Sequence, residues 1–389
     1  MSIVRDSIDA MPDSPILDVW RIARDIPDCL SLLAGEPDVP TPKFIRDAAT
    51  AALEAGLTFY THNRGIPELR AALARYLLRL YGVAVDDERI AVTSSGMSAV
   101  QLICQATIRP GDKAVAITPS WPNVMRALAI SGAEVEETPL ALGANGWSLD
   151  LEAVERACAP GTRLLYVASP ANPTGWAISR EEAEALLAMT RKRGIILVAD
   201  EVYHRIVYDR DAAFSFLEIA QPDDAVFVIN SFSKSWAMSG WRMGWMISPS
   251  GLSGTIEKLI QFNTSGGQEF LQHGAIAALD QGEDFIAEFV GRCRAGREIV
   301  SRRLAAMPRV AEIATNGSFY AMFSVKGVTD TLAFCKELAF QARIGLAPGA
   351  AFGKGAETLV RLCYAKTAPM LEEAMDRLEA HLAQKGQTH

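Results

Sequence analysis

Between residues 82 and 248, short apolar runs alternate with segments of helical periodicity, and this alternation constrains the fold more than any other feature. The runs are RIAVTS, KAVAIT, RLLYVAS, GIILVAD, AVFVIN and RMGWMIS. The helical segments are SAVQLICQATI, PNVMRALAISG, LDLEAVERAC and REEAEALLAMTRKRG. Apolar strands alternating with helices predict an α/β protein whose mostly parallel sheet is covered by helices on both faces. In such a sheet, ligands bind at the carboxyl ends of the strands.

The flanking sequence predicts a second, smaller domain. Residues 1–45 combine a short helical pattern, SPILDVWRIARDI, with the extended piece SLLAGEPDVPTP, whose prolines exclude a helix. A helix over FIRDAATAALEAG is expected to end at Gly56. Past residue 252, helical patterns broken at Gly266 and Gly267 lead into mixed strands and helices. We predict a large domain at residues 46–270, and a small α+β domain from residues 271–389 and an N-terminal arm, residues 1–45.

Composition and charge exclude several classes of function. The net charge of -8 and the absence of a Lys/Arg tract argue against a nucleic-acid partner. The six cysteines lack CxxC or CxxH spacing and the five histidines are isolated, so we expect reduced core cysteines and no metal site. No stretch approaches the ~20 apolar residues that span a bilayer, and the N-terminus lacks the apolar core of a signal peptide. The expected location is the cytoplasm.

Lys234 lies in SFSKSWAMSGWRMGW, directly after the apolar run AVFVIN. Its neighbours are Ser, Phe, Trp, Ala and Met rather than charged residues, so its ammonium should be partly desolvated. Desolvation lowers the pKa of a lysine and frees its amine to attack a carbonyl. Ser231, Ser233 and Arg242 are candidate phosphate ligands in the same stretch. This combination suits pyridoxal phosphate, an aldehyde with a phosphate, although a structural lysine at a strand end would have the same local sequence.

Other predicted strand ends also carry polar or aromatic residues. TSSGMSA at 93–99 leads into a helix whose backbone N–H groups can face an anion; an ordinary N-cap serine is the alternative. Trp121 follows a turn at Pro119, where a large ring needs either a flat partner, such as a pyridine ring, or a place in the core. Asn172, in SPANPTG, is either a turn residue or an amide donor to a phenolate oxygen.

Asp200 ends the apolar run GIILVAD, and Tyr203 follows closely. A buried carboxylate costs free energy unless it meets a cation. A protonated pyridine nitrogen would be such a cation, and its protonation lets the ring withdraw electrons. Tyr203 could then donate to an oxygen of the same cofactor.

The order and spacing of these motifs resemble those of the class I/II aminotransferases, the pyridoxal phosphate enzymes of fold type I (aspartate aminotransferase-like). SPANPTG, ADEVYHRIVYD, SFSKSWAMSGWRMGW, PGAAFG and LVRLCYA carry the resemblance, with GEPDVPTP and YTHNRGIPELR nearer the N-terminus. It extends from about residue 30 to residue 366, and the motifs are specific as a set. It implies a seven-stranded type of sheet in the large domain, and transfer of an α-amino group from an amino acid to a 2-oxo acid by a ping-pong mechanism.

The resemblance also implies roles for individual residues. Lys234 binds the cofactor as a Schiff base and moves a proton between the substrate α-carbon and the cofactor, while Asp200 pairs with the pyridine nitrogen. Arg361 grips the substrate α-carboxylate, which suits its bidentate fork. The implied catalytic residues are Lys234, Asp200 and Tyr203. The other implied contacts are Asn172 and Tyr203 to the ring oxygen, Trp121 on the ring, Gly35 and Asn172 beside the substrate, and Ser95, Gly96, Met97, Ser231, Ser233 and Arg242 at the phosphate.

Tyr60 and the pair Thr264 and Ser265 match positions that reach the phosphate of a neighbouring subunit. The resemblance therefore implies a homodimer with shared active sites, and Tyr60 counts among the cofactor-binding residues.

Departures from some family members bear on the substrate. Met97 stands where some aspartate-using relatives carry a lysine, and Gln261 stands where others carry a second arginine. The missing cations favour an apolar or aromatic amino acid. Arg64, in the loop beside the expected entrance, is the residue that could instead receive an acidic side chain.

Two other functions are compatible with parts of this pattern. The same residues would support β-elimination, such as carbon-sulfur lysis, or another reaction at the α-carbon. A regulatory relative that binds the cofactor as an effector would need an added DNA-binding module, for which the short N-terminal stretch has no room.

Overall fold

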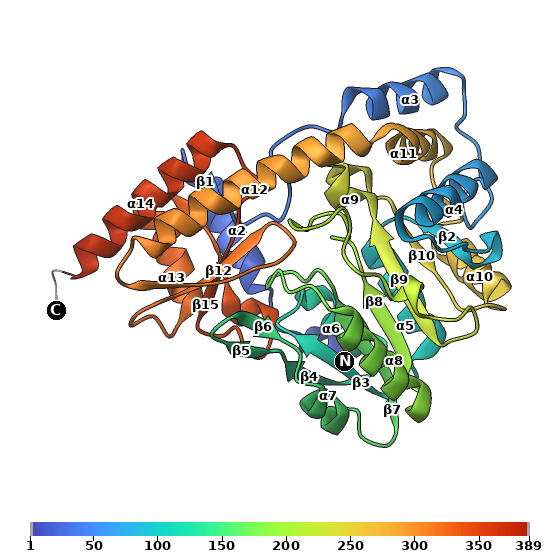
Figure 1. Cartoon of the computed structure of the whole chain (residues 1–389), viewed down its shortest axis with the longest axis horizontal. Helices are drawn as coiled ribbons and strands as arrows, with labels where there is room; N and C mark the ends of the chain where they lie inside the picture. The colour runs from blue at the N-terminus through green and yellow to red at the C-terminus, as the bar shows by residue number, and fades with distance from the viewer. Residues whose placement is uncertain (1–2, 387–389) are drawn as a thin grey trace.

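The computed structural model describes residues 3–386 and contains a large and a smaller sheet, each with packed helices (Figure 1). The large sheet has seven strands in the order β2-β10-β9-β8-β7-β3-β4. All of its strand pairs are parallel except those of β10, which is antiparallel to both neighbours. The predicted mostly parallel sheet is confirmed. Its strands are β2 (Ile90–Thr93), β3 (Lys113–Thr118), β4 (Glu134–Pro139), β7 (Thr162–Ala168), β8 (Ile196–Asp200), β9 (Val226–Ser231) and β10 (Gly244–Ile247).

Helices cover both faces of this sheet, because successive side chains of a strand point to opposite sides. Leu165 and Leu197 belong to one buried cluster, whereas Leu164 and Val198 belong to another. The helices of this part are α3 (Lys43–Glu54), α4 (Pro67–Tyr81), α5 (Gly96–Thr107), α6 (Pro122–Ile130), α7 (Leu151–Ala157), α8 (Arg180–Arg193), α9 (Phe232–Ser235), α10 (Ser253–Asn263) and α11 (Glu269–Gln281). Both predicted faces are therefore buried.

β4 was not among the predicted strands. Its sequence, EVEETP, is dominated by charged and polar residues, and β4 pairs only with β3 at the edge of the sheet. An edge strand can expose such residues, so it lacks the apolar run by which the other strands were predicted.

The smaller sheet has the order β11-β12-β15-β14 and is antiparallel. Its strands are β11 (Val310–Ile313), β12 (Tyr320–Val325), β14 (Ala347–Pro348) and β15 (Leu359–Cys363). The helices around it are α2 (Pro15–Asp25), α12 (Glu283–Ala305), α13 (Thr331–Glu337), the π-helix η4 (Leu338–Ala342) and α14 (Ala368–Gly386). The long α12 reaches from the side of α11 to the smaller sheet (Figure 1). The domain boundaries at residues 45 and 270 stay a prediction.

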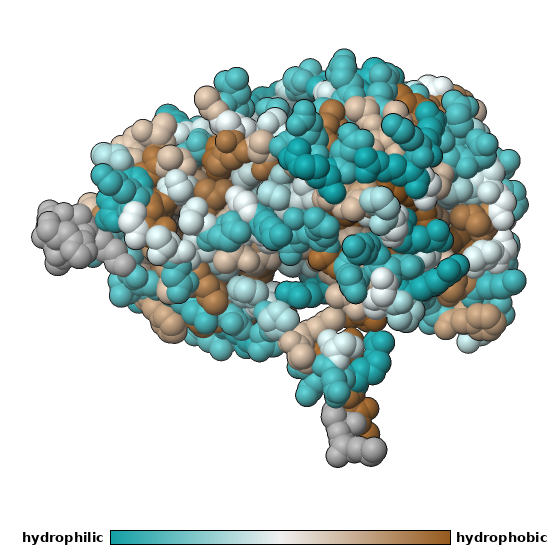
Figure 2. All heavy atoms as spheres, turned by 90° about the horizontal axis from the view of Figure 1, so that it is seen from below, coloured by the Kyte–Doolittle hydropathy of each residue, from teal (hydrophilic) through white to brown (hydrophobic). Residues whose placement is uncertain are grey.

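The N-terminal segment joins the smaller part of the molecule. β1 (Leu30–Ser31) pairs in parallel with β13 (Ile344–Gly345). The helix α1 (Asp6–Asp9) precedes α2, and in Figure 2 the segment that leads to the grey atoms at the N-terminal end projects from the body of the protein. The Arg5 guanidinium donates to the carbonyl of Ile130, at the end of α6, at 3.4 Å. This arm therefore runs from the smaller part to the large one.

The remaining elements are short. They are the hairpin β5 (Ala141–Gly143) and β6 (Gly146–Ser148), and the 3-10 helices η1 (Asp87–Arg89), η2 (Phe216–Glu218), η3 (Ser239–Trp241) and η5 (Gly349–Phe352). No helix within residues 3–386 is long and apolar enough to cross a membrane.

Candidate active site

A cavity of about 420 Å³ lies where the carboxyl ends of the large sheet face α2 and β15. Most of the residues singled out in the sequence line it. They are Gly35, Gly96, Met97, Trp121, Asn172, Asp200, Tyr203, Ser231, Ser233, Lys234, Arg242 and Arg361. The strand ends that were expected to meet at one edge of the sheet therefore do so.

Lys234 lies in α9, the short helix that follows β9. Its Nζ donates to the carbonyl of Gly35 at 2.7 Å and lies 5.6 Å from the ring centroid of Tyr203. Burial lowers the pKa of Lys234 to about 8. The desolvation expected from the apolar neighbours is confirmed, and the amine loses its proton more readily than that of an ordinary lysine.

Asp200 is buried at the end of β8 and forms no ion pair among the described residues. Burial raises the pKa of its carboxyl group, and hydrogen bonds from Tyr166 and the Val202 backbone oppose that rise. The Tyr166 hydroxyl donates to Oδ2 at 2.8 Å, and the Val202 N–H donates to Oδ1 at 3.3 Å. An unpaired buried carboxylate that opens on a cavity suits a positively charged ligand.

Tyr166 was not singled out in the sequence. It lies on β7, next to β8, where Ala168 pairs with Asp200. Only this register brings its hydroxyl to the carboxylate. A tyrosine inside an otherwise aliphatic run was the one available signal.

The turn into α5 forms another part of the wall. The Ser95 hydroxyl caps the helix by accepting from the Ser98 N–H at 2.9 Å. Gly244 on β10 packs closely against this turn, since a Cβ built on Gly244 would lie 2.6 Å from the Gly96 nitrogen. Because the first N–H groups of a helix have no partner within it, this turn can bind an anion. Ser95 itself does not line the cavity.

Ser231, Ser233 and Arg242 continue the same wall. The two serine hydroxyls lie 2.9 Å apart. Arg242 has a left-handed backbone, φ 52°, and its guanidinium donates to the Ser239 carbonyl at 2.7 Å. Hydroxyl groups beside an exposed guanidinium give donors suited to a phosphate.

Arg361 projects from β15 on the facing wall. One guanidinium nitrogen donates to Asn172 Oδ1 at 2.9 Å and another to the Leu33 carbonyl. The guanidinium also lies 4.4 Å from the ring centroid of Tyr320 and 4.9 Å from that of Phe352. The two aromatic rings and the Asn172 side chain therefore hold the Arg361 guanidinium in an orientation toward the cavity.

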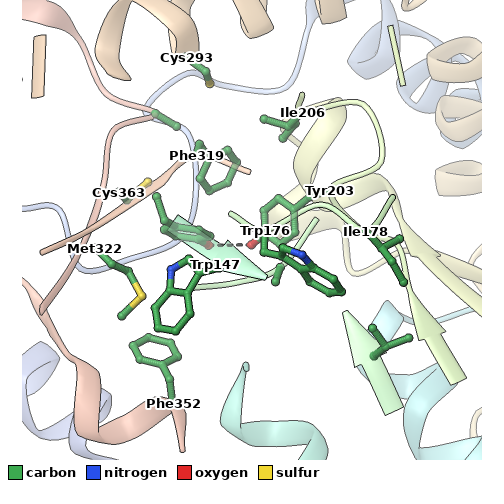
Figure 3. Packing of buried hydrophobic residues seen from close by; sticks show 14 of the residues in the cluster. Trp147, Trp176, Ile178, Tyr203, Ile206, Cys293, Phe319, Met322, Phe352 and Cys363 are labelled. Carbon is green, nitrogen blue, oxygen red and sulfur yellow. Dashed lines mark hydrogen bonds between the residues drawn. The ribbon is translucent and has the colours of Figure 1, made fainter. Parts of the chain in front are cut away.

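Tyr320 is a second residue that the sequence did not indicate. Its hydroxyl lies 2.7 Å from that of Tyr203, the bond drawn dashed in Figure 3. A Cβ built on Gly35 would lie 2.0 Å from the same Tyr320 hydroxyl. A side chain at position 35 would therefore clash with the buried Tyr320 ring, and glycine permits this close approach beside Lys234.

Several residues considered in the sequence lie away from the cavity. Tyr60 is 92% exposed, and Gln261, Thr264 and Ser265 are also exposed. Arg64 is buried, with its side chain within 3.2 Å of Glu88 and donating to the carbonyls of Asp87 and Ile90. The expectation that Arg64 could receive an acidic substrate is not met in this chain's own cavity, because its guanidinium is occupied by η1 and the start of β2.

The N-terminal helix contributes residues that the sequence did not indicate as part of a site. Ile16, Leu17 and Trp20 of α2 line the cavity, together with Leu33. Among residues 3–386, no group of three or more His, Cys, Asp and Glu side chains is placed to hold a metal ion.

Comparisons with known proteins agree with this geometry. The family model of the class I and II aminotransferases matches residues 27–378. An aspartate aminotransferase of Pyrococcus abyssi is 31% identical over 98% of each chain. An aromatic-amino-acid aminotransferase of Thermococcus litoralis is 30% identical, also over 98% of each chain. The solved structure of the Thermus thermophilus aspartate aminotransferase with maleate superposes with a TM-score of 0.90 at 30% identity, over 98% of this chain and 100% of that one.

This chain belongs to the class I and II aminotransferase family. It is a transaminase that depends on pyridoxal phosphate, as the motifs had implied.

Proposed function

We propose that the cavity binds pyridoxal phosphate and the amino-acid donor together, and that the donor carries an apolar or aromatic side chain. The observation that carries this proposal is the convergence of the Lys234 amine, the unpaired Asp200 carboxylate and the Arg361 guanidinium on one cavity. We further propose that Lys234, Asp200 and Tyr203 are the catalytic residues, and that the enzyme acts in the cytoplasm.

The residues present fit the cofactor. Asp200 offers a buried carboxyl group as partner for a protonated ring nitrogen, and Lys234 offers the aldehyde an amine that loses its proton more readily than an ordinary lysine. Trp121, on the same wall, offers a flat face for the ring. The phosphate would be held by the turn at Ser95, Gly96 and Met97, and by Ser231, Ser233 and Arg242. When bound, the cofactor supplies an electron sink for the bonds at the donor's α-carbon.

The protein would carry out the proton transfer and the positioning. The Lys234 amine would accept the proton from the donor's α-carbon, a role for which a pKa of about 8 is close to working pH. Arg361 binds the α-carboxylate and so fixes the orientation of the α-carbon. Asn172 accepts from Arg361 through Oδ1, so its amide N–H groups would be left for the ring oxygen, to which the Tyr203 hydroxyl could also donate.

A half-reaction screen tests this proposal. The purified enzyme, loaded with cofactor, is mixed with single amino acids, and the visible absorbance of the bound cofactor is followed. Conversion by apolar or aromatic amino acids, restored by a 2-oxo acid, supports it. Release of pyruvate and ammonia from cysteine conjugates without an acceptor would point instead to β-elimination.

Tyr166→Phe is expected to weaken cofactor binding about tenfold, in line with the loss of one hydrogen bond to a charged group. The Asp200 carboxylate would lose one of its two donors, and its pKa would rise further because the Tyr166 hydrogen bond no longer opposes the effect of burial. Fluorescence titration of the apoenzyme with pyridoxal phosphate measures the dissociation constant. The matched control is Tyr208→Phe, a tyrosine that donates to the Ser318 carbonyl away from this cavity. Equal dissociation constants for Tyr166→Phe and wild type would contradict a role of the Tyr166–Asp200 hydrogen bond in cofactor binding.

The depressed pKa of Lys234 predicts a pH-dependent stability of the apoenzyme. Between the folded value of about 8 and the ordinary value of 10.5, the unfolded chain holds the proton that the folded chain has lost. The contribution of Lys234 to stability therefore rises with pH across this window and is lowest below it. The melting temperatures of wild type and Lys234→Met should be compared at several pH values. From pH 8 upward, the melting temperature of wild type should rise relative to that of Lys234→Met. A difference independent of pH would contradict the depressed pKa.

We also propose a homodimer with shared active sites. Phe59, Tyr60 and Phe262 are 78%, 92% and 82% exposed, an unusual surface for a chain on its own. Thr61 joins this segment to the loop after α10 through a hydrogen bond to the Gly267 carbonyl at 3.0 Å.

Tyr60→Phe should remain a dimer in sedimentation analysis but bind the cofactor several-fold less tightly, as expected for one lost hydrogen bond. A wild-type monomer with full activity would exclude a shared site.

A further inference from the structure

α2 presents two different faces to its surroundings. Val19 and Ala23 are buried against the smaller part of the protein. Ile16, Leu17 and Trp20 line the cavity; Ile16 also packs against the core cluster that contains Val19, whereas Leu17 and Trp20 remain 49% and 39% exposed. These residues lie at i, i+1 and i+4, so Ile16 and Trp20 are neighbours on one face of the helix. Large apolar side chains left open on a cavity wall mark a place for an apolar ligand group.

The helix and the Trp20 ring are held in place. Ser14 caps α2 and Pro15 occupies its first turn, which favours the start of a helix there. The Arg24 guanidinium lies 5.0 Å from the Trp20 ring centroid, and its Nε donates to Asp25 at 3.0 Å. One side of the indole is thus covered by Arg24, and the ring can offer its remaining surface to a ligand.

The charges on the cavity wall leave no cation for a donor with an acidic side chain. Among the described residues that line it, the positively charged ones are Lys234, Arg242 and Arg361. Under the proposed function, all three are used by the cofactor and by the α-carboxylate. Leu33 and Met97 extend the apolar surface. A side-chain carboxylate placed here would lose its hydration without gaining an ion pair.

We propose that Ile16, Leu17 and Trp20 form the subsite for the donor's side chain, and that it selects large aliphatic or aromatic side chains over acidic ones. This inference rests on the proposed function and deepens it, because it names the residues that choose the donor. Apolar contact in such a pocket discriminates by roughly 10- to 200-fold. Removing the largest contact, Trp20, should therefore cost large apolar donors far more than it costs alanine, whose methyl group extends little beyond the α-carbon.

The test compares Trp20→Ala with wild type in the half-reaction, using phenylalanine, leucine, alanine and aspartate. The expected result is a loss of about tenfold or more in kcat/KM for phenylalanine and leucine, with alanine changed by less than about twofold. Phe340→Ala is the matched control, since Phe340 is a 63% exposed aromatic residue outside this cavity. Equal losses for alanine and phenylalanine, or a wild-type preference for aspartate, would overturn the inference.

A second variant and a binding measurement keep the test independent of a damaged fold. Trp20→Arg would add a cation free to pair with a side-chain carboxylate, so kcat/KM for aspartate should rise relative to that for phenylalanine. Calorimetry on wild type should show tighter binding of 3-phenylpropionate than of succinate, and Trp20→Ala should abolish that preference. Tighter binding of succinate by wild type would overturn the inference. If no amino acid converts the bound cofactor, the proposed function itself fails. If phenylalanine and leucine convert it but Trp20→Ala leaves their advantage over alanine unchanged, the subsite alone fails.

Discussion

Lys234→Ala is expected to lower the rate of amino transfer by at least ~10³-fold, the scale of a lost proton-transfer group combined with a lost covalent anchor. The visible absorbance of the bound cofactor should disappear with it. The wild-type amine lies in the cavity, 2.7 Å from the Gly35 carbonyl, and burial depresses its pKa to about 8. An alanine supplies neither a nucleophile nor a proton acceptor. Absorbance spectra and steady-state kinetics measure the two effects.

Lys366→Ala is the control for this variant. Lys366 donates to the Glu36 carbonyl at 3.1 Å, close to the site, but does not line the cavity. A small primary amine added to Lys234→Ala should restore part of the activity, because it can accept the proton that the side chain normally takes. Amino transfer by Lys234→Ala at the wild-type rate would remove Lys234 from the mechanism.

Arg361→Ala should lower kcat/KM for amino-acid donors by about a hundredfold or more, the usual cost of truncating one partner of a buried charge pair. Arg361→Lys should recover only part of this loss, because an ammonium cannot reproduce the bidentate fork. Cofactor affinity should change little, since Arg361 projects from β15 on the wall that faces the carboxyl ends of the large sheet. Stopped-flow half-reactions and cofactor titration measure the two quantities separately.

Phenylalanine and phenethylamine form the decisive pair of donors for Arg361. They differ only in the α-carboxylate, so wild type should strongly prefer phenylalanine, and Arg361→Ala should lose most of that preference. If Arg361→Ala still prefers the carboxylated donor as strongly as wild type does, another residue binds the carboxylate.

The strand ends explain why so much of this cavity could be predicted from the chain. Apolar runs identify strands locally, and parallel strands bring their carboxyl ends to one edge. Asp200 and Lys234 each follow such a run, and both line the cavity. Their proximity therefore required only the correct sheet. β4 was not predicted, because an edge strand can expose polar residues and does not need a continuous run of apolar ones.

Other contacts depend on alignments that periodicity does not encode. Tyr166 reaches Asp200 only through the register between β7 and β8. Tyr320 meets Tyr203 only because the smaller sheet packs against the carboxyl ends of the large one. Arg64 is the opposite case: it is a cation near the expected entrance, but its guanidinium is already bound by Asp87 and Glu88 of η1.

By itself, the sequence determined the α/β sheet, the cofactor and the residues at the strand ends, because local patterns of polarity and a set of ordered motifs specify them. Only the tertiary structure decided which residues surround the donor's side chain. Ile16, Leu17 and Trp20 precede the large sheet by many residues and look like one side of an ordinary amphipathic helix. They face the cavity because Val19 and Ala23 are buried on the smaller part of the protein, a long-range packing that fixes how α2 is rotated.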